Sequence, residues 1–233
     1  MHPTDKAARV AGLIYLSMVL TGPFSLIYVP GKLIVRGNAA ATANNILAHQ
    51  TLFRFGILAD MIGAIIFICL AMALHHLFSG VSKAHASLMV ALVLVSAAVG
   101  FANILNNVAA LTLFRGGADF LSAIDKPQRD ALAMLFLRLN GQGDILNETF
   151  WGLWLLPFGI LVFRSRFLPR FLGVWLIVNG FAWVALSFTG ILLSEYYGVA
   201  FRWAQPAFFG EIAVILWLLI KGAKVQPLAA PAA

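Results

Sequence analysis

The chain has 233 residues, of which 61% are hydrophobic and only 11% are charged, and its mean hydropathy is +0.91. A soluble domain keeps roughly a quarter of its residues charged to solvate its surface, so this composition excludes a soluble globular protein. The net charge of +7 comes from basic residues scattered over short polar segments, a pattern typical of topology signals and lipid contacts rather than of nucleic-acid binding. The single cysteine, Cys69, excludes intramolecular disulfides and cysteine-clustered metal sites.

Six apolar segments predict an all-α, polytopic integral membrane protein built as a six-helix transmembrane bundle, because each is long enough to cross the hydrocarbon core as a helix. A membrane β-barrel would alternate apolar and polar residues, whereas runs such as Ile65–Leu74 are apolar throughout. We expect a single transmembrane domain over residues 1–224 and a disordered cytoplasmic tail over 225–233. Its predicted spans are 9–29, 52–78, 86–114, 144–163, 171–193 and 206–220.

Breaker residues refine these spans in chain order. Gly22-Pro23 predicts a bend in the first span, and Pro30-Gly31 predicts its end. Capping residues at Thr42–Asn45 predict a loop followed by a short outer amphipathic helix before the second span. The Gly141–Gly143 stretch predicts a broken helix ahead of the fourth span, and residues 195–205 resemble a loop with interfacial aromatic anchors.

The distribution of basic residues predicts the orientation. Six spans place both termini on one side, and the basic residues of that side crowd into short turns such as Arg164, Arg166 and Arg170. Because the positive-inside effect acts most strongly in short turns, we expect the N- and C-termini in the cytoplasm.

Two longer stretches carry a resemblance to a known family. They are TANNILAHQTLFRFGILADMI at Thr42–Ile62 and GLWLLPFGILVFRSRFLPRFLGVWLI at Gly152–Ile177. Together with Glu211 and LWLLIKG at Leu216–Gly222, they resemble the bacterial membrane family called domain of unknown function 4386. The resemblance covers nearly the whole chain and implies a six-helix protein of the bacterial cytoplasmic (inner) membrane, without implying a reaction or a ligand. Arg166 stands where the family pattern is expected to have glycine.

Polar residues inside the spans are the candidate functional residues, since an ionisable group in hydrocarbon costs about 2.5–3.5 kcal/mol even on the gentler scale. One stripe is Asn140, Asp144, Asn147 and Glu148, at helical spacing, and a second is Asn103, Asn106 and Asn107. Two such stripes facing each other would line an outward-open polar pocket between the third and fourth spans. The predicted ligand or ion pocket consists of Asp60, Asn103, Asn107, Arg138, Asp144, Glu148 and Glu211.

A purely structural interpretation competes with the pocket. Arg54 and Asp60 would then form structural ion pairs, each with another helix, because their spacing of six residues puts them on different faces of one helix. The asparagines would be interhelical contacts. The histidines lie at expected helix ends or in loops, so the sequence predicts neither a metal nor a cofactor.

Three functions remain open. The first is an inner-membrane protein that binds or transports a small polar solute or ion in an outward-facing pocket. The second is a membrane-embedded enzyme acting on a lipid headgroup, with Asp60 or Glu148 as acid or base; the absence of hydrolase, phosphate-loop and metalloprotease motifs weighs against an enzyme. The third is a structural or partner-binding subunit without a ligand. The expected partners are membrane lipids and a small solute or cation, with no nucleic acid, and an oligomer is compatible with the sequence.

Overall fold

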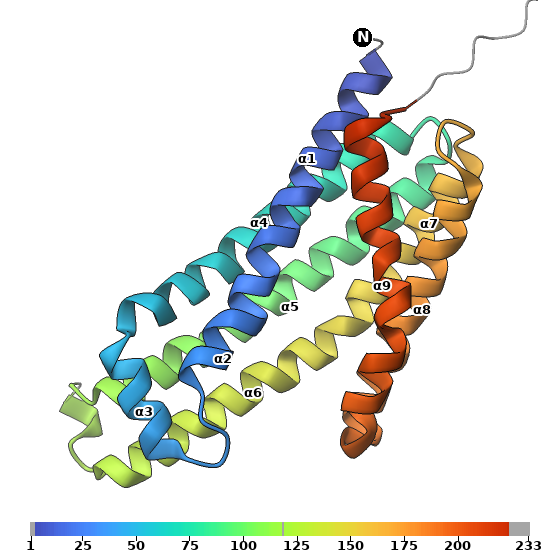
Figure 1. Cartoon of the computed structure of the whole chain (residues 1–233). Coiled ribbons are helices and arrows are strands. Elements are labelled where there is room, and N and C mark those ends of the chain that lie inside the picture. The colour runs from blue at the N-terminus through green and yellow to red at the C-terminus, as the bar shows by residue number, and fades with distance from the viewer. Residues whose placement is uncertain (1–2, 118, 224–233) are drawn as a thin grey trace, which may run out of the picture. The chain divides into compact units, whose positions relative to one another are not determined.

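The computed structural model describes residues 3–117 and 119–223, which are largely helical and contain no strand (Figure 1). The predicted all-α membrane fold is confirmed, because six helical segments are long and apolar enough to span a membrane. These segments are Thr4–Leu33, Gln50–Phe78, Lys83–Arg115, Lys126–Arg164, Arg170–Leu192 and Ser194–Ile220. The tail predicted at residues 225–233 lies outside the described residues.

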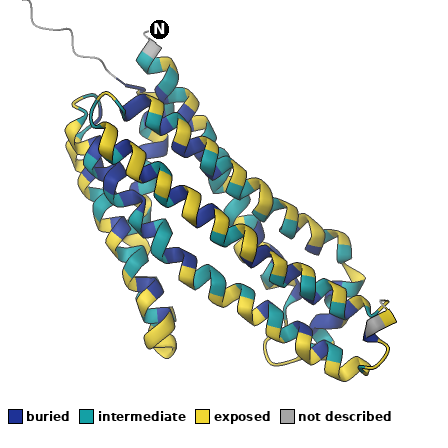
Figure 2. Ribbon diagram, turned by 180° about the vertical axis from the view of Figure 1, so that it is seen from behind, coloured by how far each residue is buried: buried dark blue, intermediate teal, exposed yellow. Residues whose placement is uncertain are grey.

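The helices follow one another in a simple order. They are α1 (Pro3–Pro23), a π-helix (Phe24–Tyr28), α2 (Val29–Leu33), α3 (Ala39–Ala48), α4 (Gln50–Phe78), α5 (Lys83–Arg115), α6 (Lys126–Leu153), α7 (Leu155–Arg164), α8 (Arg170–Leu192) and α9 (Tyr197–Ile220). Two short 3₁₀ turns, at Asp119–Leu121 and Ser194–Tyr196, complete the described chain. Figure 2 shows buried and exposed residues alternating along these helices, and many exposed residues are large and apolar, as in lipid-facing surfaces.

Local side chains set several helix starts. The Asn38 side chain accepts a hydrogen bond from Ala41 N at 2.9 Å and thereby caps α3. The short helix after the first span therefore exists, but its cap is Asn38 rather than a residue of Thr42–Asn45. The Asp125 side chain accepts from Gln128 N at 2.9 Å ahead of α6, whose second residue, Pro127, has no N–H to satisfy.

The first span changes its winding after Pro23. Beyond this proline the chain forms the π-helix, closed by a bond from Val29 N–H to the Phe24 carbonyl. The irregularity predicted at Gly22-Pro23 is thus located, and its form is a π-helix. The predicted end at Pro30-Gly31 is wrong, because α2 continues to Leu33. Pro30 lies inside the continuous helical segment Thr4–Leu33, directly after the π-helix, and prolines are tolerated inside membrane helices.

The helix break predicted at Gly141–Gly143 is also wrong. Helix α6 runs through all three residues and ends at Leu153. The break lies at Trp154, ahead of Pro157, whose missing N–H would otherwise bond the Leu153 carbonyl. Gly143 has a packing role instead, because a Cβ there would overlap the side chain of Asn103. The fourth span accordingly begins near Lys126, well before residue 144.

The loop predicted at residues 195–205 is helical from Tyr197 onward. Helix α9 continues through Pro206, which lies inside it, and the Pro206 carbonyl accepts a hydrogen bond from Trp175 Nε1 at 3.1 Å. The prediction failed because it took Pro206 as the start of a helix, whereas prolines are tolerated inside membrane helices.

The described chain forms two compact units, and α1, α4, α5 and α6 contribute residues to both. Unit 1 contains residues 3–16, 68–94 and 148–223, whereas unit 2 contains residues 17–67, 95–117 and 119–147. Each unit is described by its own contacts below.

Glycines set the packing of unit 1. A Cβ on Gly152 would overlap the Gly180 backbone, and a Cβ on Gly159 would lie 2.7 Å from the Gly173 carbonyl oxygen. The four glycines therefore form two facing pairs that bring α6 and α7 close to α8, in the manner of small residues in membrane helix packing. Beside them lies an aromatic core in which Trp154 stacks on Phe158 with ring centroids 5.4 Å apart.

Unit 2 has an apolar core of its own. Residues from α2 to α6 form it, and Thr42 Oγ1 fixes α3 against the preceding loop by accepting from Val35 N at 2.9 Å. The buried members are Val29, Leu33, Ala43, Ile46, Phe53, Ala110, Phe114, Ala133 and Leu137.

Candidate functional site: a polar cavity in unit 2

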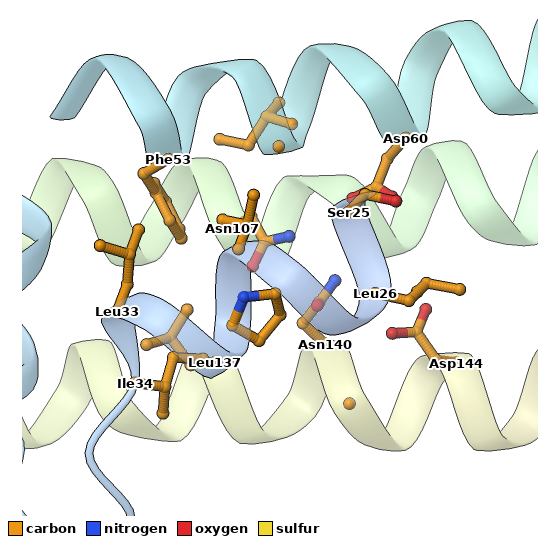
Figure 3. Close-up of a pocket in the computed structure, with 15 residues that line it drawn as sticks. Ser25, Leu26, Leu33, Ile34, Phe53, Asp60, Asn107, Leu137, Asn140 and Asp144 are labelled. Carbon is orange, nitrogen blue, oxygen red and sulfur yellow. The ribbon is translucent and has the colours of Figure 1, made fainter. Parts of the chain in front are cut away.

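Unit 2 contains a cavity of about 170 Å³ beside this core (Figure 3). Its wall comes from the π-helix, α2, α4, α5 and α6, so that segments far apart in the sequence meet there. The lining residues are Ser25, Leu26, Val29, Pro30, Leu33, Ile34, Phe53, Gly56, Ile57, Asp60, Asn107, Leu137, Asn140, Gly141 and Asp144.

Two carboxyl groups lie toward one end of this cavity. Asp60 comes from α4 and Asp144 from α6, and Figure 3 shows them on opposite walls. The π-helix brings Ser25 beside Asp60, and a side-chain hydrogen bond links the two. Both carboxyl groups are half-buried, so they border the hollow without being sealed by packing.

Asparagines orient Asp144 and join α5 to α6. Asn103 Nδ2 donates to the Asn140 carbonyl at 2.8 Å and to Asp144 Oδ1 at 2.9 Å. Asn140 Nδ2 returns a bond to the Asn103 carbonyl at 3.3 Å, and Asn106 Nδ2 donates to Asn103 Oδ1 at 3.0 Å. Gly143 leaves the space that the Asn103 side chain occupies. The two polar stripes inferred from the sequence therefore meet in unit 2 through Asn103.

No cationic side chain lines the cavity. None of its fifteen described lining residues is a lysine, arginine or histidine. In the described chain the ion pairs are Asp5–Arg9 at 3.4 Å and Lys126–Asp130 at 2.6 Å. Two acidic side chains, Asp60 and Asp144, therefore border the cavity.

The structure does not place Arg54 and Asp60 in ion pairs within the part of the chain it describes. Arg54 is exposed, whereas Asp60 turns toward Ser25 and the cavity. Their separation of six residues, about 240° around a helix, explains why the two side chains leave α4 in different directions.

Comparison with known proteins places the chain in a family. A family model described as "Domain of unknown function (DUF4386)" matches residues 10–222. The chain belongs to this family. It is also 31% identical over 84 residues to a protein of Archaeoglobus fulgidus that is named "Uncharacterized protein". That match covers 35% of the chain and 47% of the archaeal protein, so it spans about half of this relative's length. No solved structure matches the chain.

In this DUF4386 protein, five of the predicted pocket residues belong to unit 2. Asp60, Asn107 and Asp144 line the cavity, and Asn103 contacts Asp144. Arg138 is exposed and is not part of the cavity wall. The cavity wall therefore contains only some of the predicted pocket residues, and Arg138 is not one of them.

Glu211 belongs to unit 1 and has its own partners there. Its carboxyl group accepts hydrogen bonds from the Tyr15 hydroxyl, from Asn179 Nδ2 at 2.9 Å and from Trp183 Nε1 at 3.5 Å. Three donors from α1 and α8 thus converge on one side chain of α9. Such convergence is typical of a structural polar network in a membrane helix bundle.

Glu148 also belongs to unit 1. It is only 4% exposed, and its Oε1 accepts a hydrogen bond from the Tyr197 hydroxyl. Its other oxygen, Oε2, has no hydrogen-bond partner among the described residues. Glu148 and Glu211 were predicted as pocket residues, but neither lines the unit 2 cavity.

Sequence reasoning missed two polar members of the cavity wall. Ser25 was not a candidate, although its position two residues after Pro23 is the signal that could have found it. Asn140 belonged to a predicted stripe but was not assigned to the pocket. In the described residues no group of three His, Cys, Asp or Glu side chains is placed to hold a metal ion.

Proposed function

We propose that this membrane protein binds a small cation or cationic solute in the unit 2 cavity. The observation that supports the proposal is that Asp60 and Asp144 border one cavity whose described lining residues include no basic side chain. Two carboxyl groups on the wall of one cavity would attract a cationic guest.

The energetic argument starts from the environment of the two carboxyl groups. A charged group in a membrane-spanning helix is costly unless it is paired or solvated, and it marks a ligand or ion pathway by default. Asn103 Nδ2 donates a hydrogen bond to Asp144 Oδ1, and Ser25 lies beside Asp60. A bound cation between Asp60 and Asp144 would be attracted by both, and the apolar surroundings would strengthen that attraction.

The proposal includes an orientation. With both termini in the cytoplasm of a bacterial inner membrane, the basic turn at Arg164, Arg166 and Arg170 would face the cytoplasm and the unit 2 cavity would lie toward the outer leaflet. A green fluorescent protein fused after Ala233 should then fluoresce, and an alkaline phosphatase fused there should be inactive. The opposite pattern would reverse the orientation.

The test of binding uses thermal unfolding of the full chain in detergent with ammonium, methylammonium or sodium chloride, against choline chloride at equal ionic strength as the bulky reference. At a ligand concentration of one hundred times Kd, binding stabilises the folded state by about 2.7 kcal/mol. We expect at least one small cation to stabilise the protein saturably, and Asp60→Asn or Asp144→Asn to abolish the effect. Asp119→Asn is the matched control, because Asp119 is exposed and remote from the cavity wall.

An unfolding temperature that no small cation changes would overturn the proposal and favour a structural subunit. If binding is found, uptake of the labelled cation into proteoliposomes would distinguish a transporter from a receptor.

A further inference from the structure

We propose that unit 1 has a binding site for an anionic phospholipid, in an open pocket between the start of α1 and the end of α4. The pocket has a volume of about 440 Å³. Its lining residues are Lys6, Ala7, Val10, Ala73 and His76, all of which belong to unit 1. None of them lines the unit 2 cavity, so this proposal does not depend on the cation site.

The pocket lies at the depth of lipid headgroups. Lys6 is two residues from the start of the first span, Thr4–Leu33, and His76 is two residues from the end of the second, Gln50–Phe78. Figure 1 shows both of these helix ends toward the top of the view. Polar groups so close to the end of a span lie where the hydrocarbon meets the headgroups.

The polar residues of the pocket are hydrogen-bond donors. Lys6 is exposed and has a positively charged ammonium group with three donors, and His76 offers a ring N–H in either tautomer. The acidic residue of α1, Asp5, pairs with Arg9 at 3.4 Å, and the ion pairs of the described chain do not include Lys6. A phosphate group would therefore complement the charge of Lys6 and accept hydrogen bonds from both residues.

An apolar stripe on α1 leads away from this polar end. Lys6, Val10 and Leu13 follow one another at i, i+4 and i+7, so the three side chains share one face of the helix. Val10 and Leu13 are both exposed. This face therefore has a cationic group at the membrane surface and uncovered apolar groups below it.

Helix α4 repeats the arrangement in the opposite chain direction. His76, Ala73 and Cys69 share one face at the same spacing, and Cys69 is exposed. The seven residues from His76 to Cys69 correspond to about 10 Å along the helix. Cys69 therefore lies at the depth of acyl chains when His76 lies at the headgroups.

This combination favours a whole phospholipid over a free phosphate ion. A free ion would use only the polar end, whereas a phospholipid would also cover the exposed apolar stripes with an acyl chain. Basic pockets between transmembrane helices recognise anionic headgroups through this attraction. Phosphatidylcholine fits less well, because its headgroup carries a positive charge that Lys6 would repel.

The experiment uses the full chain labelled with monobromobimane at Cys69, the single cysteine. The protein is reconstituted into phosphatidylcholine vesicles that contain either phosphatidylglycerol or phosphatidylcholine with brominated acyl chains. Bromine quenches the fluorophore only at close range, so the quenching reports which lipid lies against α4. At equal mole fraction we expect brominated phosphatidylglycerol to associate about fivefold more tightly, which is the attraction that one lysine adds at a membrane surface.

Charge substitutions locate the headgroup. Lys6→Gln should bring the two lipids to nearly equal association, and His76→Gln should lower the preference by a smaller factor. Lys83→Gln is the matched control, because Lys83 is an exposed lysine of unit 1 that does not line the pocket. This control should leave the preference for phosphatidylglycerol unchanged.

A further variant tests the pocket without changing any charge. Val10→Phe would place a phenyl ring in the hollow and should remove most of the preference for phosphatidylglycerol. Val178→Phe is its matched control, because Val178 is also an exposed valine of unit 1 and does not line the pocket.

Three outcomes would overturn the proposal. Equal quenching by the two brominated lipids on the unchanged chain would show contact with bulk membrane lipid only, and this comparison needs no variant to fold. A preference that falls as much with Lys83→Gln as with Lys6→Gln would belong to the whole basic surface. A preference that Val10→Phe leaves intact would place phosphatidylglycerol outside the pocket.

Discussion

Units 1 and 2 use the same polar residue types inside apolar helices, but they surround them differently. In unit 1, Glu211 accepts hydrogen bonds from three donors within a glycine-packed, aromatic core. In unit 2, Asp60 and Asp144 border a cavity of about 170 Å³. A carboxyl group in a membrane helix is therefore either enclosed by hydrogen-bond donors or placed at a cavity, according to the space beside it. The residue type alone does not determine which of these two environments the carboxyl group has.

The backbone explains part of this difference. In unit 1 the glycine pairs Gly152–Gly180 and Gly159–Gly173 leave no room for even one Cβ between the helices. In unit 2 the chain beside the carboxyl groups is a π-helix followed by Pro30, both of which are departures from regular α-helical bonding. Close packing leaves no hollow at these glycine pairs of unit 1, whereas the irregular segment in unit 2 forms part of a cavity wall.

The largest effect is expected where unit 1 has no spare space. Gly159→Ala should lower the free energy of unfolding by about 3 kcal/mol, because its Cβ would meet the Gly173 carbonyl oxygen and Ile177 Cγ1, each at 2.7 Å. Gly198→Ala is the matched control, since nothing lies within 4 Å of a Cβ at that position. Thermal unfolding in detergent measures both. Equal stability of the two variants would show that the α7–α8 contact is not tight.

The next effect compares the two kinds of carboxyl group. Glu211→Leu should cost about 2 kcal/mol, because three hydrogen bonds worth roughly 0.6 kcal/mol each are lost and their donors remain. Asp60→Leu should change stability by less than about 0.5 kcal/mol, since Asp60 has a serine partner and borders a hollow that leucine partly fills. Unfolding titrations of both variants measure these changes in stability. Equal losses for Glu211→Leu and Asp60→Leu would contradict the distinction between the units.

The smallest effect concerns a turn in unit 1. Arg166 has a φ of +60°, in the left-handed region that favours glycine, which explains why the family pattern led us to expect glycine there. Arg166→Gly should raise stability by about 0.5 kcal/mol, because relief of the left-handed strain exceeds the added flexibility of glycine. Arg164→Gly, at the end of α7, should lower stability. A lower melting temperature for Arg166→Gly would refute the strain argument.

The sequence was sufficient for the number of spans, because length and apolarity determine which segments can cross hydrocarbon, but it placed the starts of the fourth and sixth spans too late. It also predicted that the stripe containing Asn103 would face the one containing Asp144, since helical spacing places each set on one face. It misjudged Gly143 and Pro206, because both residues break helices in water but serve packing or bonding roles inside a membrane bundle.

The division of the carboxyl groups between two units could not be predicted from the sequence. Tyr15 and Glu211 are 196 positions apart, and no local pattern connects them. Asn147 illustrates the same limit. It belongs to the stripe that includes Asp144, yet it bonds Ser96 Oγ at 2.9 Å and the Ser96 carbonyl at 3.2 Å. Only the three-dimensional neighbours decide whether a polar group has found a partner.

The π-helix at Phe24–Tyr28 determines how the cavity wall responds to a change of chain length. Its i to i+5 bonding takes up one more residue per turn than an α-helix does. Deleting one residue there would allow the segment to rewind as an α-helix, and Val29 and Leu33 would nearly keep their directions. Deleting one residue within Val29–Leu33 has no such bulge to absorb it, and the residues that follow would rotate by about 100°. Among related chains, a single-codon loss would therefore be compatible with the same cavity wall when it falls in the π-helix and incompatible with it a few positions later.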